Sequence, residues 1–446
     1  MYTENFSLDK INDLSKKDAQ EYLTKYFIPL SDGNHALYSN KKYTILDQKV
    51  IKNTYFNRMS IELNNFYFKQ YTGIKSVVYK FQPETLNNNE LNLCPEMKSK
   101  KKSFASYDEN TQNGVFKVLD FIKLILASND KDQYQYLIKW FANMLKGNKN
   151  DACLYLKGEQ GIGKSTLFDF IQSHVIGDGL YLQTGSNPLK SNFNAILGGK
   201  LFVVFEELEC FSTNEWSAIS SVLKRYITEK TYVLEAKYAG SYQAENINNY
   251  VINSNNDSIR DDDGRRYFIC DVSHKYKDNH DYFDKLRKEC FNDAVGEAFY
   301  NYMIEVDTND FYPQKYPMTK NKLISHIKRL PKEYEFIKQN YILKSLGIKC
   351  TPKVLYNEYK EFCSKPIVKG EFMTKLSNVG ICDKKTSGNN YYKYSFEQLK
   401  KIGEEKHWLH ETDDYEDVNE QDDNKTIEEK DNIIENLKLE IESLKK

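Results

Sequence analysis

The chain has 446 residues, of which 40% are hydrophobic and 28% are charged, and its formal net charge is −1. This length allows about three domains and at least one large core. No run approaches the roughly 18 uncharged apolar residues that cross a bilayer, and the acidic residues Asp9, Asp13 and Asp18 do not fit a secretory signal. We therefore expect an intracellular protein, cytoplasmic or nuclear, that is not secreted and has no membrane partner.

The eight cysteines are scattered along the chain and form no C-x-x-C pair. Such spacing favours neither a zinc site nor a disulfide framework, so we interpret the cysteines as small buried hydrophobic residues.

Residues 1–108 mix short aromatic runs with polar turns, which predicts an α+β region whose function the sequence does not reveal. Neither Asp47 nor Glu62 belongs to the kind of acidic cluster that two-metal nucleotide transfer requires. We therefore expect priming and polymerisation to reside in separate proteins.

Residues 109–148 carry apolar side chains at helical spacing, in the runs 115–126 and 134–145. This pattern predicts a helical lead-in to the next segment, and an amphipathic pair that simply packs in the core is the alternative.

An apolar run at residues 154–156 leads into the pattern G-x-x-x-x-G-K-S and then into a second helical pattern. Glycines let the backbone wrap a triphosphate with its N–H groups pointing inward, and the following helix adds its positive N-terminal end. In such a loop, Lys164 contacts the β- and γ-phosphates and Ser165 binds magnesium. The predicted nucleotide-binding residues are Gly158, Gly161, Gly163, Lys164, Ser165 and Thr166.

The run 201–205 is apolar on both faces and ends in Glu206 and Glu207. This pattern predicts a buried parallel strand whose carboxyl end places paired acids beside the phosphates. One carboxylate, assigned here to Glu206, positions Mg²⁺, and the other orients the attacking water. The alternative is a solvated helix cap, since Glu209 continues the acidic run.

A third apolar strand at 250–252 leads into an asparagine-rich cluster, in which we choose Asn255. An amide can contact a terminal phosphate or water without adding negative charge. Ordinary turn chemistry is the alternative.

The loop at 259–266 then places Arg265 and Arg266 before another apolar run, where either guanidinium could reach the nucleotide of an adjacent subunit. A surface loop of Arg–Asp ion pairs is the alternative for this segment.

From Lys320 to His410 the chain has 19 Lys and Arg against 9 Asp and Glu, whereas the segment from Glu411 onward has 5 Lys against 14 acids. Two helical patterns, 351–362 and 369–376, precede a basic hairpin with Tyr391 and Tyr392, which suggests a winged helix. Such a fold binds DNA or protein. The candidate phosphate contacts are Lys369, Lys375, Lys384, Lys385 and Lys393.

The acidic segment 411–424 predicts a linker. After it, Ile427, Ile434 and Ile441 recur seven residues apart, which predicts a short coiled coil. A solvated single helix or a partner-docking segment is the alternative.

The strings GEQGIGKS, LFVVFEE, YVINSNND and DDDGRRY, in this order, resemble the superfamily 3 helicases, and more narrowly the poxvirus-type primase-helicase ATPases of large DNA viruses and related mobile elements. The resemblance implies an AAA+-like P-loop NTPase fold of the α/β class, with ATP and Mg²⁺ bound. It implies a homo-oligomeric ring, expected to be a hexamer, at a viral replication site. It also implies that Lys237 and Tyr238 lie on a hairpin that contacts a single strand in the channel, although an ordinary exposed hairpin tip is the alternative.

The expected organisation follows. It comprises an α+β region at 1–108, a helical lead-in or collar at 109–148, an ATPase core at 149–310, a winged-helix-like basic domain at 320–408, and an acidic linker with a short coiled coil at 409–446. The resemblance implies an ATP-dependent replicative DNA helicase that unwinds duplex DNA at a fork. The alternatives are an origin-binding or nucleoprotein-remodelling ATPase without processive unwinding, and a non-catalytic replication scaffold.

Overall fold

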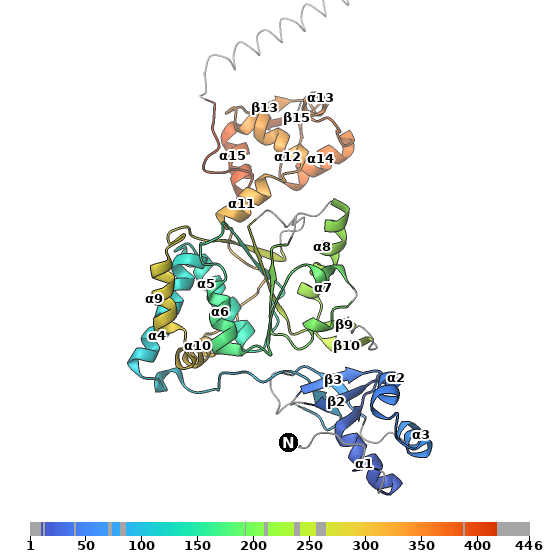
Figure 1. Cartoon of the computed structure of the whole chain (residues 1–446). Coiled ribbons are helices and arrows are strands. Elements are labelled where there is room, and N and C mark those ends of the chain that lie inside the picture. The colour runs from blue at the N-terminus through green and yellow to red at the C-terminus, as the bar shows by residue number, and fades with distance from the viewer. Residues whose placement is uncertain are drawn as a thin grey trace, which may run out of the picture. The chain divides into compact units, whose positions relative to one another are not determined.

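The computed structural model describes residues 10–11, 14–39, 42–69, 74–80, 86–191, 193–208, 213–235, 241–255, 265–386 and 389–416. The chain divides into two compact units, Met1–Thr319 and Lys320–Lys446 (Figure 1). Each unit is described by itself. No helix in the described part of the chain combines the length and apolarity that a membrane span requires.

The first unit begins with a small α+β region. Its elements are α1 (Lys16–Tyr26), β1 (Phe27–Pro29), β2 (His35–Ser39), β3 (Lys42–Leu46), α2 (Gln48–Val50), α3 (Ile61–Lys69), β4 (Ser76–Val78) and β5 (Glu90–Asn92). Strands β1, β2 and β3 form an antiparallel sheet, and α1 and α3 share a core with it. The Tyr67 hydroxyl donates to the Phe27 carbonyl in that core. This region has its own small hydrophobic centre.

The centre of the first unit is a five-stranded parallel sheet in the order β12-β6-β11-β8-β7. Its strands are β6 (Cys153–Lys157), β7 (Tyr181–Thr184), β8 (Phe202–Glu206), β11 (Asn249–Ser254) and β12 (Tyr267–Asp271). The apolar runs at 154–156, 201–205 and 250–252 therefore form strands, as predicted. The predicted α/β class with a parallel sheet is confirmed.

Side chains along each strand alternate between two cores, because successive residues of a strand point to opposite faces. In β6, Leu154 and Leu156 join one core, whereas Cys153 and Tyr155 join the other. Both faces of the sheet are therefore covered, which explains why the middle positions of β6, β8 and β11 are apolar on both faces.

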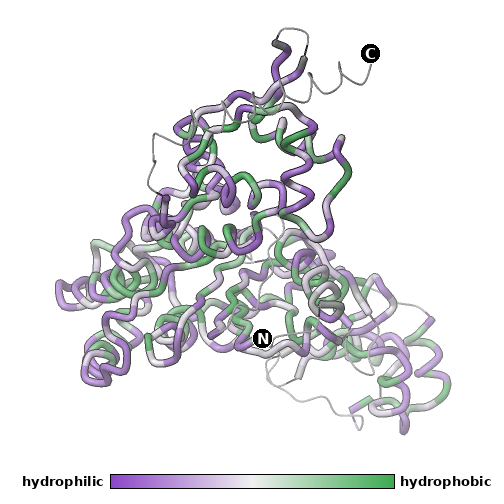
Figure 2. Tube along the Cα trace, turned by 90° about the horizontal axis from the view of Figure 1, so that it is seen from above, coloured by the Kyte–Doolittle hydropathy of each residue, from purple (hydrophilic) through white to green (hydrophobic). Residues whose placement is uncertain are grey.

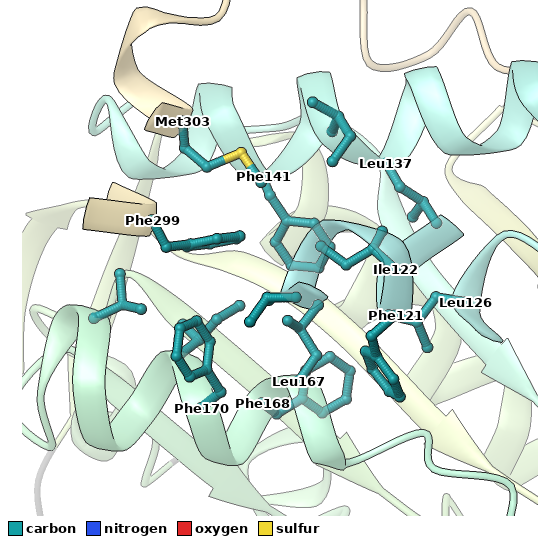
Figure 3. Packing of buried hydrophobic residues seen from close by; sticks show 14 of the residues in the cluster. Phe121, Ile122, Leu126, Leu137, Phe141, Leu167, Phe168, Phe170, Phe299 and Met303 are labelled. Carbon is teal, nitrogen blue, oxygen red and sulfur yellow. The ribbon is translucent and has the colours of Figure 1, made fainter. Parts of the chain in front are cut away.

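Helices cover the first face of the sheet (Figure 1). They are α4 (Glu109–Phe121), α5 (Lys131–Leu145), α6 (Thr166–Phe170), α9 (His280–Cys290) and α10 (Asp293–Glu305). Phe141 of α5, Phe168 of α6 and Phe299 of α10 belong to this core (Figure 3). Each fully buried side chain of this size contributes about 1.5–3 kcal/mol by leaving water. The predicted lead-in helices therefore belong to the core of the sheet.

The second face is covered by α7 (Asn187–Lys190), α8 (Thr213–Thr228) and the antiparallel hairpin of β9 (Thr231–Glu235) and β10 (Ser241–Glu245). The tip of this hairpin, 236–240, lies outside the described residues. Green and purple alternate along the helices in Figure 2. Helices of such mixed composition bury their apolar residues and leave the polar ones to water.

The second unit has its own core. Its elements are α11 (Lys320–Ile327), α12 (Lys332–Ile337), β13 (Ile348–Cys350), α13 (Pro352–Phe362), α14 (Lys369–Asn378), β14 (Lys384–Thr386), β15 (Asn389–Tyr394) and α15 (Phe396–Glu405). Strand β15 is central in an antiparallel sheet of order β13-β15-β14. The two helices and the hairpin that the sequence indicates are present, while β13 and α15 were not anticipated. The predicted coiled coil lies outside the described residues.

Candidate functional site

The turn after β6 is tight and relies on two glycines. Gly161 and Gly163 adopt φ angles of 80° and 90°, which side-chain-bearing residues rarely adopt. A Cβ on Gly161 would lie 2.1 Å from Asp278 Oδ1, and one on Gly163 would lie 2.5 Å from the Phe283 ring. Glycine is therefore required at both positions by conformation and by space.

The ammonium group of Lys164 is folded into this loop. Its Nζ donates to the carbonyl oxygens of Gly158 and Glu159, the latter at 2.8 Å, and to Asn255 Oδ1 at 2.7 Å. Only 7% of the Lys164 residue surface is exposed. The loop thus satisfies all three lysine donors with its own oxygens and one amide.

Asn255 links Lys164 to the second acid of the predicted pair. Its Nδ2 donates to Glu207 Oε1 at 2.7 Å, while its Oδ1 accepts from Lys164. Glu207 has a φ of 41°, and its backbone N–H donates to the Asn253 carbonyl at 2.8 Å. A positive φ at a glutamate is a strained conformation of the kind found at functional sites.

Asn253 makes the matching link for the first acid. Its Nδ2 donates to Glu206 Oε2 at 2.9 Å and contacts Ser165 Oγ at 3.2 Å. Gln183 of β7 also donates to Glu206, at 3.0 Å. Sequence reasoning chose Asn255 and missed Asn253. The available signal was a polar residue near the end of a strand that is buried on both faces.

Charge and burial shift the ionisation of this cluster. Burial raises the pKa of Glu206, the hydrogen bond from Asn253 opposes that shift, and the carboxylate of Glu207 reinforces it. Burial lowers the pKa of Lys164, and the carboxylates of Glu206 and Glu207 oppose the shift. The cluster therefore combines a desolvated cation with a desolvated carboxylate, a combination typical of functional sites.

These residues line a pocket of about 400 Å³, within the range of small-molecule sites. Its far wall comes from the segment before α9 and from α9 itself, through Asp278, His280, Phe283 and Arg287. Asp169 of α6 also lines the pocket, and Arg287 opposes the upward shift that burial gives the pKa of Asp169. Sequence reasoning missed this wall, because nothing in the local pattern of 278–287 indicates a contact with a loop about 120 residues earlier.

The same segment fastens the loop from outside. Lys277 forms an ion pair with Glu159, and the Asp278 N–H donates to the Gly161 carbonyl at 3.1 Å. Asp278 itself has a φ of 55°. These contacts fix the position of the loop relative to α9.

A second and larger cavity, of about 780 Å³, lies between α7, α8 and the β9–β10 hairpin. It contains none of the predicted site residues, and its lining mixes apolar side chains such as Ile219 and Val222 with acids and Arg225. We place the site at the smaller cavity because the strained backbone and the lysine, amide and carboxylate network converge there.

Arg265 and Arg266 lie away from this pocket. Arg266 directly precedes β12, and its carbonyl accepts from the Cys153 N–H at 2.8 Å at the start of β6. The loop begins at the opposite end of β6, five residues or about 17 Å along the strand. The two arginines therefore lie at the amino ends of the strands, whereas the pocket of their own chain lies at the carboxyl ends.

The remaining predicted DNA contacts are dispersed. Lys237 and Tyr238 lie outside the described residues. Lys369, Lys384, Lys385 and Lys393 are exposed in the second unit. Lys375 instead forms an ion pair at 2.7 Å with Glu333, whose side chain is only 4% exposed. Tyr392 is buried and donates to Met373 Sδ at 2.8 Å, so of the two wing tyrosines only Tyr391 reaches the surface.

The oxygen set around Ser165 fits a magnesium ion. Asn253, which contacts both Ser165 and Glu206, has a buried Oδ1 with no hydrogen-bond partner. Magnesium prefers oxygen ligands, and with nucleotide phosphates it needs only one or two from protein. The described residues contain no cluster of three or more His, Cys, Asp or Glu suited to another metal.

Comparison with known proteins places this chain beside phage replication proteins. Residues 156–266 match a family described as a family of unknown function (DUF5906). The chain is 26% identical over 188 residues to a DNA primase-polymerase of Nitratiruptor phage NrS-1, across 41% of this chain and 26% of the phage protein. The chain thus spans about a quarter of that relative.

Two solved structures share the fold. The apo structure of the NrS-1 C-terminal region has a TM-score of 0.54 and 17% identity, and covers 84% of this chain and 97% of its own. The A form apo structure of the same region has a TM-score of 0.55 and 18% identity, with 84% and 98% covered. The chain is therefore homologous to a phage primase-polymerase, and its fold is that of the C-terminal region of NrS-1.

Proposed function

We propose that this protein is an ATP-dependent DNA helicase of phage-type or mobile-element replication, with a P-loop NTPase core of the superfamily 3 kind. The observation that carries the proposal is that two asparagines join the loop to the acids by hydrogen bonds. Asn255 joins Lys164 to Glu207. Asn253 joins Ser165 to Glu206. A glycine-rich turn without nucleotide chemistry has no need of a partly buried acid linked to its serine and a second acid linked to its lysine, each through an asparagine.

The roles of the residues follow from their positions. Backbone N–H groups of 158–165 cradle the triphosphate, and Lys164 exchanges its present oxygen partners for phosphate oxygens. Glu207, oriented by Asn255, accepts a proton from the attacking water. Ser165 and Glu206 would hold Mg²⁺, which when bound neutralises charge on the phosphates.

The position of Arg265 and Arg266 supports a ring. Neither lines the pocket of its own chain, so a guanidinium can serve catalysis only at the pocket of a neighbour. A head-to-tail interface of this kind forms a ring when the rotation between subunits closes, and we propose a closed hexamer by resemblance to superfamily 3 helicases. The likeness to a phage primase-polymerase supports a role in viral DNA replication. We propose that priming is left to other proteins, because the sequence of residues 1–108 offers no acidic cluster of the kind that two-metal nucleotide transfer requires.

The experiment is strand displacement on forked DNA with purified protein, ATP and magnesium, with Lys164→Ala as the control. We expect displacement by the wild type and none by the variant. DNA-stimulated hydrolysis without displacement would instead support a remodelling or origin-binding ATPase. Displacement by both proteins would contradict the proposal.

A further inference from the structure

The small sheet of the second unit presents four side chains on one face, Lys349, Lys384, Tyr391 and Lys393, here called the lysine–tyrosine face. Lys349 of β13 is the cross-strand partner of Lys393 in β15, and Lys384 of β14 is the partner of Tyr391. Tyr391 and Lys393 are two residues apart on β15. Partner residues, and residues two apart on a strand, share a face of the sheet.

Burial confirms this alternation. Tyr391 is 37% exposed, and Lys349, Lys384 and Lys393 are all exposed. The intervening residues Ile348 and Tyr392 are each 1% exposed and belong to the core, together with side chains of α12, α13, α14 and α15. The helices therefore pack on the other side of the sheet, and within this unit the lysine–tyrosine face is open.

The lysines of this face are not neutralised by ion pairs within the described residues. The three strands contain no acid, and none of the three lysines forms an ion pair with a described residue, Asp383 beside Lys384 included. Lys375, in contrast, is neutralised by Glu333. The three lysines of the lysine–tyrosine face thus differ from Lys375 in having no ion-pair partner within the described residues.

Like charges placed directly opposite each other destabilise a sheet, so the pair Lys349 and Lys393 needs an explanation. Protection against edge-to-edge aggregation explains lysine on the edge strands β13 and β14. It does not explain Lys393, because β15 is the central strand and both its edges are already paired.

We infer that the lysine–tyrosine face binds a single nucleic-acid strand, with Lys349, Lys384 and Lys393 on its phosphates and Tyr391 stacked on a base. Lysines supply the sequence-independent attraction, and an exposed aromatic ring between them supplies a platform for any base. An acidic peptide would use the lysines but would gain little from the ring. The inference takes DNA as the partner from the proposed function and adds a second contact region that does not depend on the nucleotide pocket.

The test is fluorescence anisotropy of the full chain with a labelled single-stranded oligonucleotide, without ATP and over a range of salt. We expect Lys349→Ala/Lys393→Ala to lower affinity and to reduce the slope of log affinity against log salt by about 1.4, or 0.7 per lost phosphate contact. Tyr391→Ala should lower affinity about tenfold with little change of slope. The matched control is Lys332→Ala/Lys360→Ala, which removes the same charge from α12 and α13. This control should bind the oligonucleotide more tightly than Lys349→Ala/Lys393→Ala.

A charge reversal separates binding from folding. Lys393→Glu would place a carboxylate opposite Lys349, so we expect an equal or higher melting temperature together with weaker binding. Wild-type affinity and slope in both Lys393 variants would overturn the inference. An equal loss of affinity in the control variant would also overturn it. A third contrary result would be displacement of the oligonucleotide by an acidic peptide, together with unchanged affinity in Tyr391→Ala. Because ATP is absent, a failure here is distinct from a failure of the nucleotide pocket.

Discussion

Asn255 Oδ1 accepts a hydrogen bond from Lys164 Nζ at 2.7 Å, and this contact ties the end of β11 to the loop after β6. The other end of the same amide donates to Glu207. Because both links pass through one side chain, a change at the lysine, such as the arrival of a phosphate, alters what orients the glutamate. Asn255 can thus couple occupancy of the loop to the position of the carboxylate that we propose as the base.

The first prediction concerns this coupling. We expect Asn255→Ala to reduce kcat for ATP hydrolysis about a hundredfold, as removal of one oriented polar group at a reaction centre typically does. The KM for ATP should change much less, because the loop and Lys164 remain. Steady-state kinetics with circular dichroism as the folding control checks this, and an unchanged kcat would remove Asn255 from the reaction.

The second prediction concerns Glu206 and pH. A carboxyl with a raised pKa in the folded state adds stability that is present below its ordinary pKa and is lost as pH rises through the folded-state pKa. At neutral pH ionised Glu206 therefore destabilises the fold, and Glu206→Gln should melt at a higher temperature than the wild type.

Thermal melts without nucleotide, between about pH 4 and pH 8, check the sign. The advantage of Glu206→Gln should shrink as the solution becomes acidic and Glu206 is protonated. The variant should also lose ATPase activity. A lower melting temperature than wild type at neutral pH would contradict the assigned direction of the shift.

The third prediction concerns Arg287, the cation on the far wall of the pocket. We expect Arg287→Ala to raise the KM for ATP about tenfold, because a charge-assisted contact to phosphate is lost. Its matched control is Lys288→Ala, which removes one charge from the next position of α9 and does not line the pocket. Equal effects of the two variants would mean that Arg287 acts only through net charge.

The fourth prediction concerns Arg266 at the far edge of the sheet. Arg266→Ala and Lys164→Ala subunits should each be inactive alone and should regain part of the ATPase activity when mixed. In a mixed ring, an intact loop of one subunit can meet an intact arginine of its neighbour. Absence of recovery in mixtures that assemble would contradict action in trans, and the same mixture with Arg265→Ala would identify which guanidinium serves.

The sequence indicated the loop, the acid-bearing end of β8 and the asparagine-rich end of β11, because these signals are local. Fixed glycine spacing and short apolar runs ending in polar residues identify their structure without knowledge of the rest of the chain. It did not indicate Asn253, because an asparagine at a strand end is common and its value lies in contacts with Ser165 and Glu206.

Contacts between distant segments were also beyond local patterns. The wall of α9 meets the loop only after folding, and the pairing of Lys375 with buried Glu333 removed one lysine from the predicted basic surface. The register that sets Lys349 opposite Lys393 depends on β13, which the sequence did not suggest. Charge counts therefore found the basic unit but could not say which lysines share a face.

The central claim is that the pocket around Lys164 hydrolyses ATP. The most direct measurement is phosphate release by the purified full chain with ATP and magnesium, compared with Lys164→Ala at matched concentration and matched circular dichroism. The account predicts magnesium-dependent turnover by the wild type and a loss of about a hundredfold or more in the variant. Equal turnover by both proteins, or none by the wild type with magnesium and DNA present, would contradict it.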